Sequence, residues 1–229
     1  MVVRSKSAAF YNKTPRATKA CGFDPACRDC PRLAAYLDQI RREHPDYHAR
    51  PVAPFGPGRA ALLVVGLAPG LHGANRTGRP FTGDHAGILL YGTLHRFGFA
   101  SQAGSSDPRD GLKLLDCRVT NAVKCLPPQN KPRPDEVRRC NRYLAAEIAA
   151  ARPRAILALG AIAHRAVLMA FGLAPGGKRF AHRAVHELPG ARLFDSYHCS
   201  RYNTQTRRLT ASGFEAVIRD IRTFLRGAR

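Results

Sequence analysis

The sequence predicts an α/β protein, a three-layer α/β/α sandwich around a central, mostly parallel sheet of about four strands. Short apolar runs, of the kind buried in parallel sheets, begin near residues 62, 119 and 154. Each run is followed, after a loop, by a segment in which apolar residues recur at helical spacing. The 229 residues can bury one good-sized core. We therefore expect a single domain over residues 21–229, preceded by a basic arm at residues 1–20.

The first half of the chain is predicted to contain two helices around a buried strand. Residues 31–43 open with a proline, which suits the first turn of a helix, and their leucines recur at helical spacing. The proline-rich residues 44–58 have no periodicity and form a connector. Leu62–Gly66 is a short apolar strand, and residues 87–99 again show helical spacing.

The second half of the chain continues the alternation of strands and helices. A proline followed by two acidic residues predicts a helix start at Pro134, where the acids favour the positive end of the helix dipole. His164, on one of the later helices, is predicted to have no role. The expected elements are strands at 119–123 and 154–160, helices from 134 and over 161–171, a hairpin of 185–188 and 192–194, and a closing helix at about 210–226.

The formal net charge of +21 points to a nucleic-acid partner. Positive charge spread over a surface displaces the counterions of a phosphate backbone, although ribosomal and membrane-surface proteins share this composition. The chain contains no apolar run long enough to cross a bilayer, so we expect no membrane association. Residues 1–20 contain basic but no acidic residues. A targeting peptide is one interpretation, and a flexible arm that adds DNA affinity is the one we favour.

A long glycine-rich loop follows the first strand, from Leu67 to Gly87. Loops at the carboxyl ends of parallel strands are where open α/β sheets bind ligands, and glycines let the backbone approach a ligand closely. Within this loop, Phe81 can stack on a planar ring and Asp84 can orient or deprotonate a water. The alternative is a surface loop without chemistry.

Two stretches of the sequence resemble a known family. The loop reads Gly-Leu-Ala-Pro and then His-Gly-Ala-Asn-Arg-Thr-Gly-Arg-Pro-Phe-Thr-Gly-Asp. It is similar to motif 1 of the uracil-DNA glycosylase superfamily, and in particular to family 5, the iron–sulfur type b enzymes. Residues 198–203 resemble motif 2, in which a histidine and a short loop follow the last strand. Leu67 stands where the related family 4 enzymes carry a catalytic acid, which moves attention to Asp84.

The resemblance implies a monofunctional DNA glycosylase. Such an enzyme flips uracil out of DNA and hydrolyses its N-glycosidic bond, which starts base excision repair, with hypoxanthine, xanthine and other deaminated bases as further candidate substrates. Asp84 would stabilise the sugar cation and steer the water, and His198 would donate a hydrogen bond to uracil O2. Neither motif contains a lysine for a Schiff base, so no lyase activity is expected.

The same resemblance assigns further contacts with the base and with DNA. Phe81 would stack on uracil, and the amide of Asn121 would read its edge. Arg201 and Tyr202 would wedge into the minor groove. The implied base-contacting residues are Gly66, Leu67, Ala68, Phe81, Asn121 and His198, and the implied DNA-contacting residues are Arg76, Ser200, Arg201, Tyr202 and Asn203.

Four of the seven cysteines form a candidate metal site. Cys27 and Cys30 are three positions apart, so their thiolates can reach one metal. With Cys125 and Cys140 they reproduce the layout that holds a 4Fe-4S cluster in families 4 and 5, where its expected role is to clamp the DNA-facing surface. The residues alone leave zinc and no metal open, because thiolates suit either ion. Cys21 is a rival to Cys27 as a ligand.

Two other functional classes are alternatives to a glycosylase. A non-catalytic nucleic-acid-binding protein would use the same basic surface, but it gives no reason for Asp84 beside Phe81. A metal-dependent phosphoesterase would need clustered carboxylates to hold hard cations, and the loops contain almost none besides Asp84. We expect a monomeric cytoplasmic enzyme that associates with the nucleoid through DNA.

Overall fold

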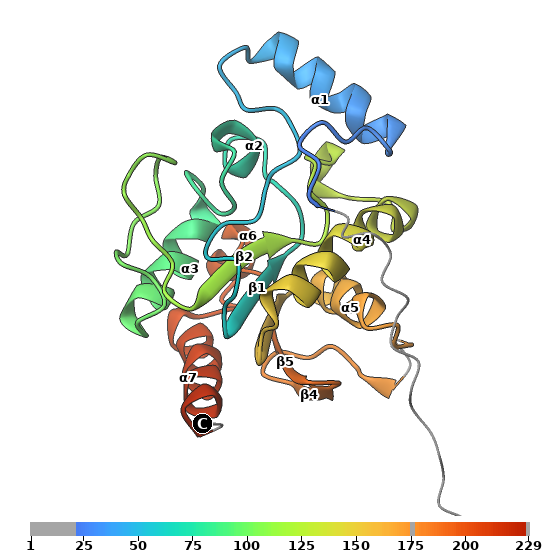
Figure 1. Cartoon of the computed structure of the whole chain (residues 1–229). Helices are drawn as coiled ribbons and strands as arrows, with labels where there is room; N and C mark the ends of the chain where they lie inside the picture. Colours follow the sequence, from blue (N-terminus) through green and yellow to red (C-terminus); the bar gives the residue numbers. More distant parts are fainter. Residues whose placement is uncertain (1–21, 175–176, 228–229) are drawn as a thin grey trace, which may run out of the picture.

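The structure, a computed structural model, describes residues 22–174 and 177–227 (Figure 1). The predicted basic arm and Cys21 lie outside these residues. The described elements are α1 (Pro31–Glu43), β1 (Leu62–Gly66), α2 (Ala74–Thr77), α3 (His85–Arg96), β2 (Cys117–Asn121), η1 (Pro128–Asn130), α4 (Pro134–Ala151), β3 (Ala155–Leu159), α5 (Ala161–Ala170), β4 (Val185–Leu188), β5 (Ala191–Ser196), α6 (Arg201–Gln205) and α7 (Ala211–Gly227).

The strands form one five-stranded sheet in the order β2-β1-β3-β5-β4. β1 lies between β2 and β3 and is parallel to both, and β3 is parallel to β5. β4 is antiparallel to β5, because the tight turn at Pro189-Gly190 reverses the chain. The predicted mostly parallel α/β sheet is confirmed, and its hairpin brings the strand number to five instead of about four.

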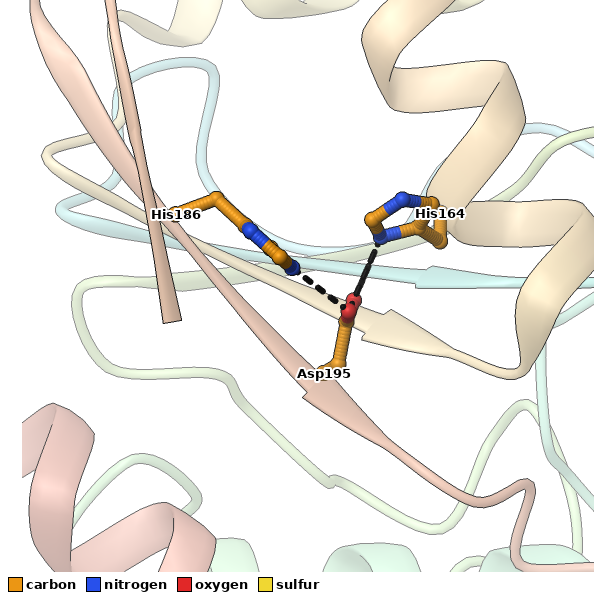
Figure 2. Close-up of side chains that lie close together, drawn as sticks. All are labelled: His164, His186 and Asp195. Atoms are coloured by element: carbon orange, nitrogen blue, oxygen red, sulfur yellow. Dashed lines mark hydrogen bonds and ion pairs between the residues drawn. The ribbon is translucent and has the colours of Figure 1, made fainter. Parts of the chain in front are cut away.

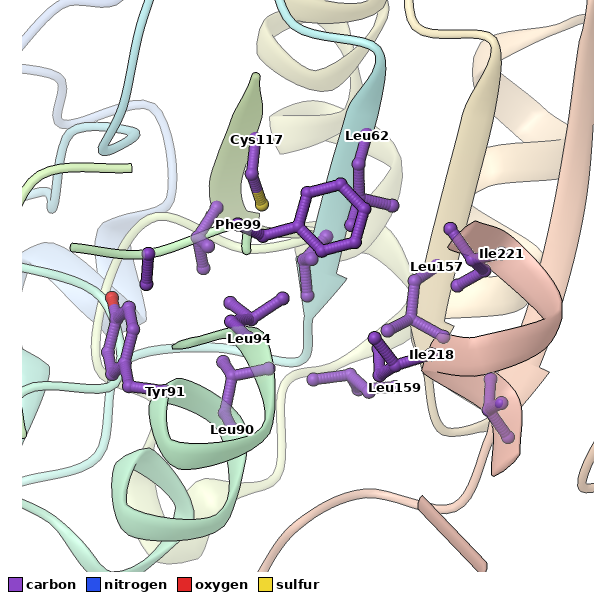
Figure 3. Packing of buried hydrophobic residues seen from close by; sticks show 14 of the residues in the cluster. Leu62, Leu90, Tyr91, Leu94, Phe99, Cys117, Leu157, Leu159, Ile218 and Ile221 are labelled. Atoms are coloured by element: carbon purple, nitrogen blue, oxygen red, sulfur yellow. The ribbon is translucent and has the colours of Figure 1, made fainter. Parts of the chain in front are cut away.

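Helices cover both faces of the sheet, which confirms the three-layer arrangement (Figure 1). Side chains alternate along β1, so that Leu62 and Val64 belong to one core cluster and Leu63 and Val65 to the other. The first cluster packs the sheet against α3 and α7 (Figure 3). The second packs it against α4 and α5. Among the described residues, no helix has the length and apolarity needed to cross a membrane.

Three differences from the sequence prediction affect the site. β2 starts and ends two residues earlier than predicted, which puts Asn121 at the carboxyl end of the sheet beside Gly66. α3 starts at His85, because the Asp84 side chain caps it. The stretch after His198, predicted to be a short loop, contains the helix α6, whose N-cap is Ser200.

Candidate active site

The carboxyl ends of the parallel strands surround a cavity of about 470 Å³. Phe81 and Asp84 reach it from the loop after β1, and Asn121 reaches it from the end of β2. His198 reaches it from the segment after β5. Two stretches more than a hundred residues apart in the sequence therefore line one cavity, because parallel strands present their carboxyl ends at the same edge of a sheet.

Gly66, predicted to contact the base, is not part of the cavity lining, but it lies in close contact with two of these side chains. A Cβ atom placed on Gly66 would lie 2.4 Å from Asn121 Oδ1 and 2.5 Å from Phe81 Cζ. Phe81 has a left-handed backbone, with φ of 54°. Its ring stacks on that of His198, with 5.8 Å between centroids and 29° between planes. Phe81 is buried in the core cluster, yet its ring forms part of the cavity wall.

Asn121, a residue of the cavity lining, has an unpaired acceptor on its side chain. Its Oδ1 atom is buried and has no hydrogen-bond partner among the described residues. Leaving such an atom buried and unpaired costs about 1–3 kcal/mol, so a ligand that donates a hydrogen bond to it gains affinity. This arrangement suits a planar ring with an N–H group on its edge.

The carboxylate of Asp84 is held in a fixed orientation. Its Oδ1 atom accepts a hydrogen bond of 2.8 Å from the backbone N–H of Gly87. Its Oδ2 atom lies over Gly73, where a Cβ would come within 2.3 Å of it. Burial raises the pKa of Asp84 above its ordinary value, while hydrogen bonds from the backbone of Gly87 and Ala86 act in the opposite direction. The group is therefore positioned, and partly desolvated, at the cavity wall.

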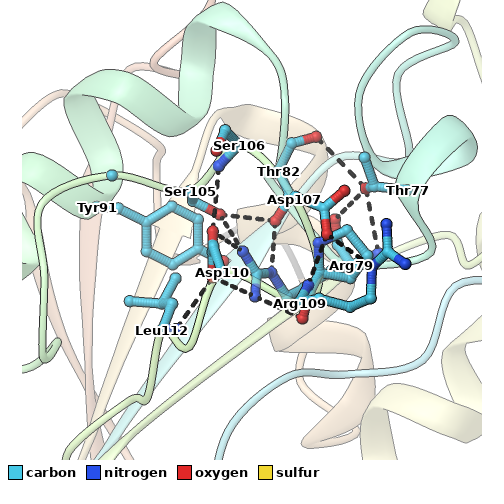
Figure 4. A network of polar contacts seen from close by, with 12 residues as sticks. Thr77, Arg79, Thr82, Tyr91, Ser105, Ser106, Asp107, Arg109, Asp110 and Leu112 are labelled. Atoms are coloured by element: carbon cyan, nitrogen blue, oxygen red, sulfur yellow. Dashed lines mark hydrogen bonds and ion pairs between the residues drawn. The ribbon is translucent and has the colours of Figure 1, made fainter.

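A buried polar network holds the segment that carries Phe81 (Figure 4). The Arg79 guanidinium forms two hydrogen bonds with the Asp110 carboxylate, of 2.7 and 3.0 Å, and donates a third, of 2.8 Å, to Thr82 Oγ1. This ion pair lowers the pKa of Asp110 to about 2. The Tyr91 hydroxyl donates to the Pro80 carbonyl at 2.7 Å. These contacts fix the residues on both sides of Phe81 and support its left-handed backbone.

His198 is neutral at physiological pH, because burial lowers its pKa to about 4. A neutral imidazole carries one N–H group, so it can donate one hydrogen bond without carrying a positive charge. The side chain of Asn203 donates a hydrogen bond of 2.8 Å to the His198 carbonyl. Asn203, predicted to contact DNA, thus holds the backbone of the cavity histidine.

The other predicted contact residues divide into two groups. Leu67 and Ala68 line the cavity, as do Ser200 and Arg201 from motif 2. The remainder lie outside its lining. Arg76 donates from Nε to the His72 carbonyl at 2.8 Å. Tyr202 is 68% exposed.

Sequence reasoning missed one wall of the cavity. This wall is formed by the end of β3 and the start of α5, from Leu159 to Ile162. Asn130 and His85, which were also not predicted, line other parts of the cavity. Gly160 has φ of 97° and connects the strand directly to the helix. The signal was available, because Gly160 follows a predicted buried strand, and the carboxyl ends of such strands border ligand sites.

Comparison with known proteins identifies the family. Residues 53–222 match the sequence model of the Uracil DNA glycosylase superfamily. The chain belongs to the uracil-DNA glycosylase superfamily. It is similar to the Type-5 uracil-DNA glycosylase of Thermus thermophilus, with 48% identity over 201 residues that cover 84% of this chain and 91% of that protein. The Type-5 enzyme of Pyrobaculum aerophilum is 42% identical over 197 residues, which cover 84% of this chain and 86% of that protein.

Type-4 uracil-DNA glycosylases match a smaller part of this superfamily member. The Type-4 uracil-DNA glycosylase of Pyrobaculum aerophilum is 37% identical over 127 residues, which cover 55% of this chain and 57% of that protein. The resemblance to family 5, read from the two motifs, is confirmed.

The four predicted ligand cysteines of this superfamily member surround a second, smaller cavity. Cys30 is the N-cap of α1, Cys140 lies on α4, and Cys125 follows β2. The backbone N–H of Lys124 donates to Cys140 Sγ at 3.3 Å. Burial raises the pKa of Cys125, and the negative charge of the other three cysteines at the cavity, in their thiolate form, raises it further.

The surroundings of these sulfurs fit a thiolate-bound group. Arg142 Nη2 lies 3.8 Å from Cys27 Sγ, and the Arg32–Glu136 ion pair, with 2.7 Å between Nη2 and Oε2, joins the two cysteine-bearing helices. Four soft ligands with N–H donors around them suit an iron–sulfur cluster, and the donor set alone suits zinc as well. Cys117 and Cys199 are buried in the core cluster on the other face of the sheet.

The lowered pKa of His198 predicts a loss of stability in mild acid. The unfolded chain takes up a proton as the pH falls through about 6.5, whereas the folded protein does so only near 4. The free energy of unfolding should therefore decrease between these two pH values, with no contribution from this group above pH 6.5. Urea titrations of the wild type and of His198→Gln would check this, because the variant should lose less stability over the same interval. Equal losses would contradict it.

Proposed function

We propose that the protein is a monofunctional uracil-DNA glycosylase of the family 5 type, which hydrolyses the bond between uracil and deoxyribose in DNA. The observation that carries the proposal is the convergence of Asp84, Phe81, Asn121 and His198 on one cavity of about 470 Å³. The volume is at the scale of small-ligand sites, about 300–1,000 Å³. The comparisons support the same activity, since relatives that match most of the chain are named for it.

Each side chain has a role that its geometry supports. Phe81 stacks on the extruded base, and Asn121 Oδ1 accepts a hydrogen bond from its N3–H group, which cytosine lacks. As the glycosidic bond breaks, negative charge collects on the base, and the neutral His198 imidazole donates a hydrogen bond to it. Positive charge develops on the sugar at the same time. The fixed Asp84 carboxylate stabilises this charge and orients the attacking water.

The duplex is opened by the residues at the mouth of the cavity. Arg201 and Tyr202 are exposed on α6, directly after the cavity residue Ser200. In this proposal they fill the space that the extruded nucleotide leaves. The remaining affinity comes from basic side chains on phosphates, which position the enzyme without reading sequence.

The direct test is an excision assay on a duplex that contains one uracil. Alkali cleaves the strand wherever the base has been released, so the product is visible on a gel. We expect complete release without added metal and in the presence of a magnesium chelator, which separates this enzyme from a phosphoesterase. A protein that bound the duplex but released no base would be the non-catalytic nucleic-acid binder.

We also propose that Cys27, Cys30, Cys125 and Cys140 hold a 4Fe-4S cluster. When bound, the cluster supplies a structural cross-link and takes no part in the hydrolysis. Cys125 lies on the connection between Asn121 and Asn130, both of which line the cavity, so the clamp also restrains the active site.

Cys125→Ser should therefore abolish the visible absorption of the freshly purified protein and lower its melting temperature. A zinc site would be colourless in the wild type. Cys117→Ala is the matched control, because Cys117 is buried but remote from the small cavity. It should leave the absorption spectrum unchanged.

Three further features belong to the proposal. Hypoxanthine and xanthine are substrates, because Leu67 replaces an acid at the cavity and leaves selection to the shape of the pocket. Oligonucleotides that contain each base would test this range. The enzyme acts as a monomer, and in the cytoplasm it associates with the nucleoid through its charge of +21.

A further inference from the structure

A buried cluster of three ionisable side chains lies outside the cavity (Figure 2). His164 on α5 and His186 on β4 both point at Asp195 on β5. His164 Nδ1 lies 2.9 Å from Asp195 Oδ1, and His186 Nε2 lies 3.1 Å from Asp195 Oδ2. None of the three side chains lines the cavity. The proposed chemistry does not use them, so their burial needs another reason.

The hydrogen bonds around His164 define its protonation state. Nδ1 faces the Asp195 carboxylate, and Nε2 lies 2.8 Å from the Lys178 carbonyl. A carbonyl can only accept a hydrogen bond, so Nε2 carries a proton. The Asp195 carboxylate, which as an anion can only accept hydrogen bonds, lies against Nδ1, so Nδ1 carries a proton as well. His164 is therefore an imidazolium ion paired with a buried carboxylate.

The other groups around His164 do not change this assignment. Burial has the largest single effect on the pKa of His164 and lowers it, and the positive charge of Arg165 on the same helix lowers it slightly. The contacts with Asp195 and Lys178 together outweigh both, so the pKa is raised. The Phe180 ring packs on His164 edge to face and carries no charge. From β4, His186 uses its Nε2 atom on Asp195.

The ion pair connects two walls of the cavity. Asp195 lies near the end of β5, three residues before His198. His164 lies in the first turn of α5, where its N–H donates to the carbonyl of Gly160, a cavity residue. The N–H of Gly160 in turn donates to the Ser196 carbonyl at 2.8 Å. A shift of Asp195 would therefore move both Gly160 and the segment that leads to His198.

We propose that the His164–Asp195 ion pair is a positioning device for His198, an inference that rests on the proposed glycosylase function. It fixes the end of β5 against the start of α5, so that the His198 ring stays stacked on Phe81. The same atoms lie within 4.8 Å of one another and could ligate a metal ion. These atoms already form hydrogen bonds with one another within the described part of the chain, so we infer a charge pair and not a metal site.

A double-mutant cycle tests the proposal. Single-turnover rates of uracil release would be measured for the wild type, Asp195→Asn, His198→Ala and the double variant. We expect Asp195→Asn to reduce the rate about tenfold in the wild type, with unchanged DNA affinity, and less than about twofold in the His198→Ala background, because residues that act as a unit are not additive. Equal losses in both backgrounds would overturn the proposal. His95→Asn, a histidine outside the cavity on α3, is the matched control and should keep the wild-type rate.

Two further measurements keep the outcomes separate. Nitrogen NMR of labelled histidine should show both His164 ring nitrogens protonated at pH 7 in the wild type, and a lower pKa of this ring in Asp195→Asn. A neutral His164 ring would overturn the charge assignment, whether or not the protein releases uracil. A wild-type protein that released no uracil would instead count against the proposed glycosylase function. One equivalent of zinc, lost in His164→Gln, would show a metal site instead. If Asp195→Asn fails to fold, His164→Gln replaces it in the cycle.

Discussion

Asp84→Asn should lower the single-turnover rate of uracil release by about 10²–10⁴-fold, the contribution usual for a positioned carboxylate in acid–base or water-activating roles. In the proposed mechanism the negative charge of Asp84 stabilises the sugar cation; the substitution removes this charge but keeps the shape of the side chain. An asparagine Oδ1 can still accept the hydrogen bond from Gly87 that caps α3. The fold and the cavity should therefore persist, and the loss should appear in the rate and not in DNA affinity.

The measurement is a single-turnover assay with excess enzyme, combined with DNA binding and a melting temperature. Asp107→Asn is a matched control, because this exposed carboxylate is not part of the cavity lining and pairs with Arg109. It should retain full activity. A loss of less than about threefold in Asp84→Asn, with normal binding, would remove Asp84 from the mechanism and leave His198 as the main source of catalysis.

Gly66→Ala should reduce uracil release by about 10²-fold or more while DNA binding remains. The new Cβ would lie 2.4 Å from Asn121 Oδ1 and 2.5 Å from Phe81 Cζ, whereas ordinary contacts are 3.4–4 Å. One or both side chains must therefore move by about an ångström, a displacement that can cost about 10²-fold in rate when it misplaces reacting groups. Because Phe81 and Asn121 both contact the base in the proposed mechanism, the expected defect is in the placement of the base.

Gly92→Ala is the matched control for this substitution. Gly92 lies in the middle of α3, and a Cβ there would meet no atom within 4 Å. It should leave the rate unchanged, and alanine's higher helix propensity should leave the melting temperature equal or higher. If Gly66→Ala released uracil at the wild-type rate with an intact fold, the base would not occupy the space between Phe81 and Asn121.

The cavity depends on the way in which parallel strands are joined. Each crossover returns the chain to the same end of the sheet, so that β1, β2, β3 and β5 all deliver their following segments to one edge. The functional side chains then need only short supports of their own. Asp84 is fixed by a helix cap, Phe81 by the Arg79 network, and His198 by Asn203 and the end of β5.

The sequence by itself determined the layers of this protein, because burial imposes a period of two on strands and 3.6 on helices. It also determined the family, since the loop from Leu67 to Gly87 and the segment at 198–203 are contiguous stretches whose residue order is specific. The start of α1 at Pro31 and of α4 at Pro134 followed from local chemistry alone.

Only the tertiary structure decided how the site is supported. Several supports of the site join segments whose contact the sequence pattern does not predict. They are the Arg79–Asp110 pair, the Asn203 contact with the His198 carbonyl and the cavity wall at Gly160. The sequence predicted no role for His164 for the same reason, because its partner Asp195 lies on a separate element, the strand β5. Periodicity reports whether a residue is buried, and the choice of partner across the core is set by the packing of all the elements together.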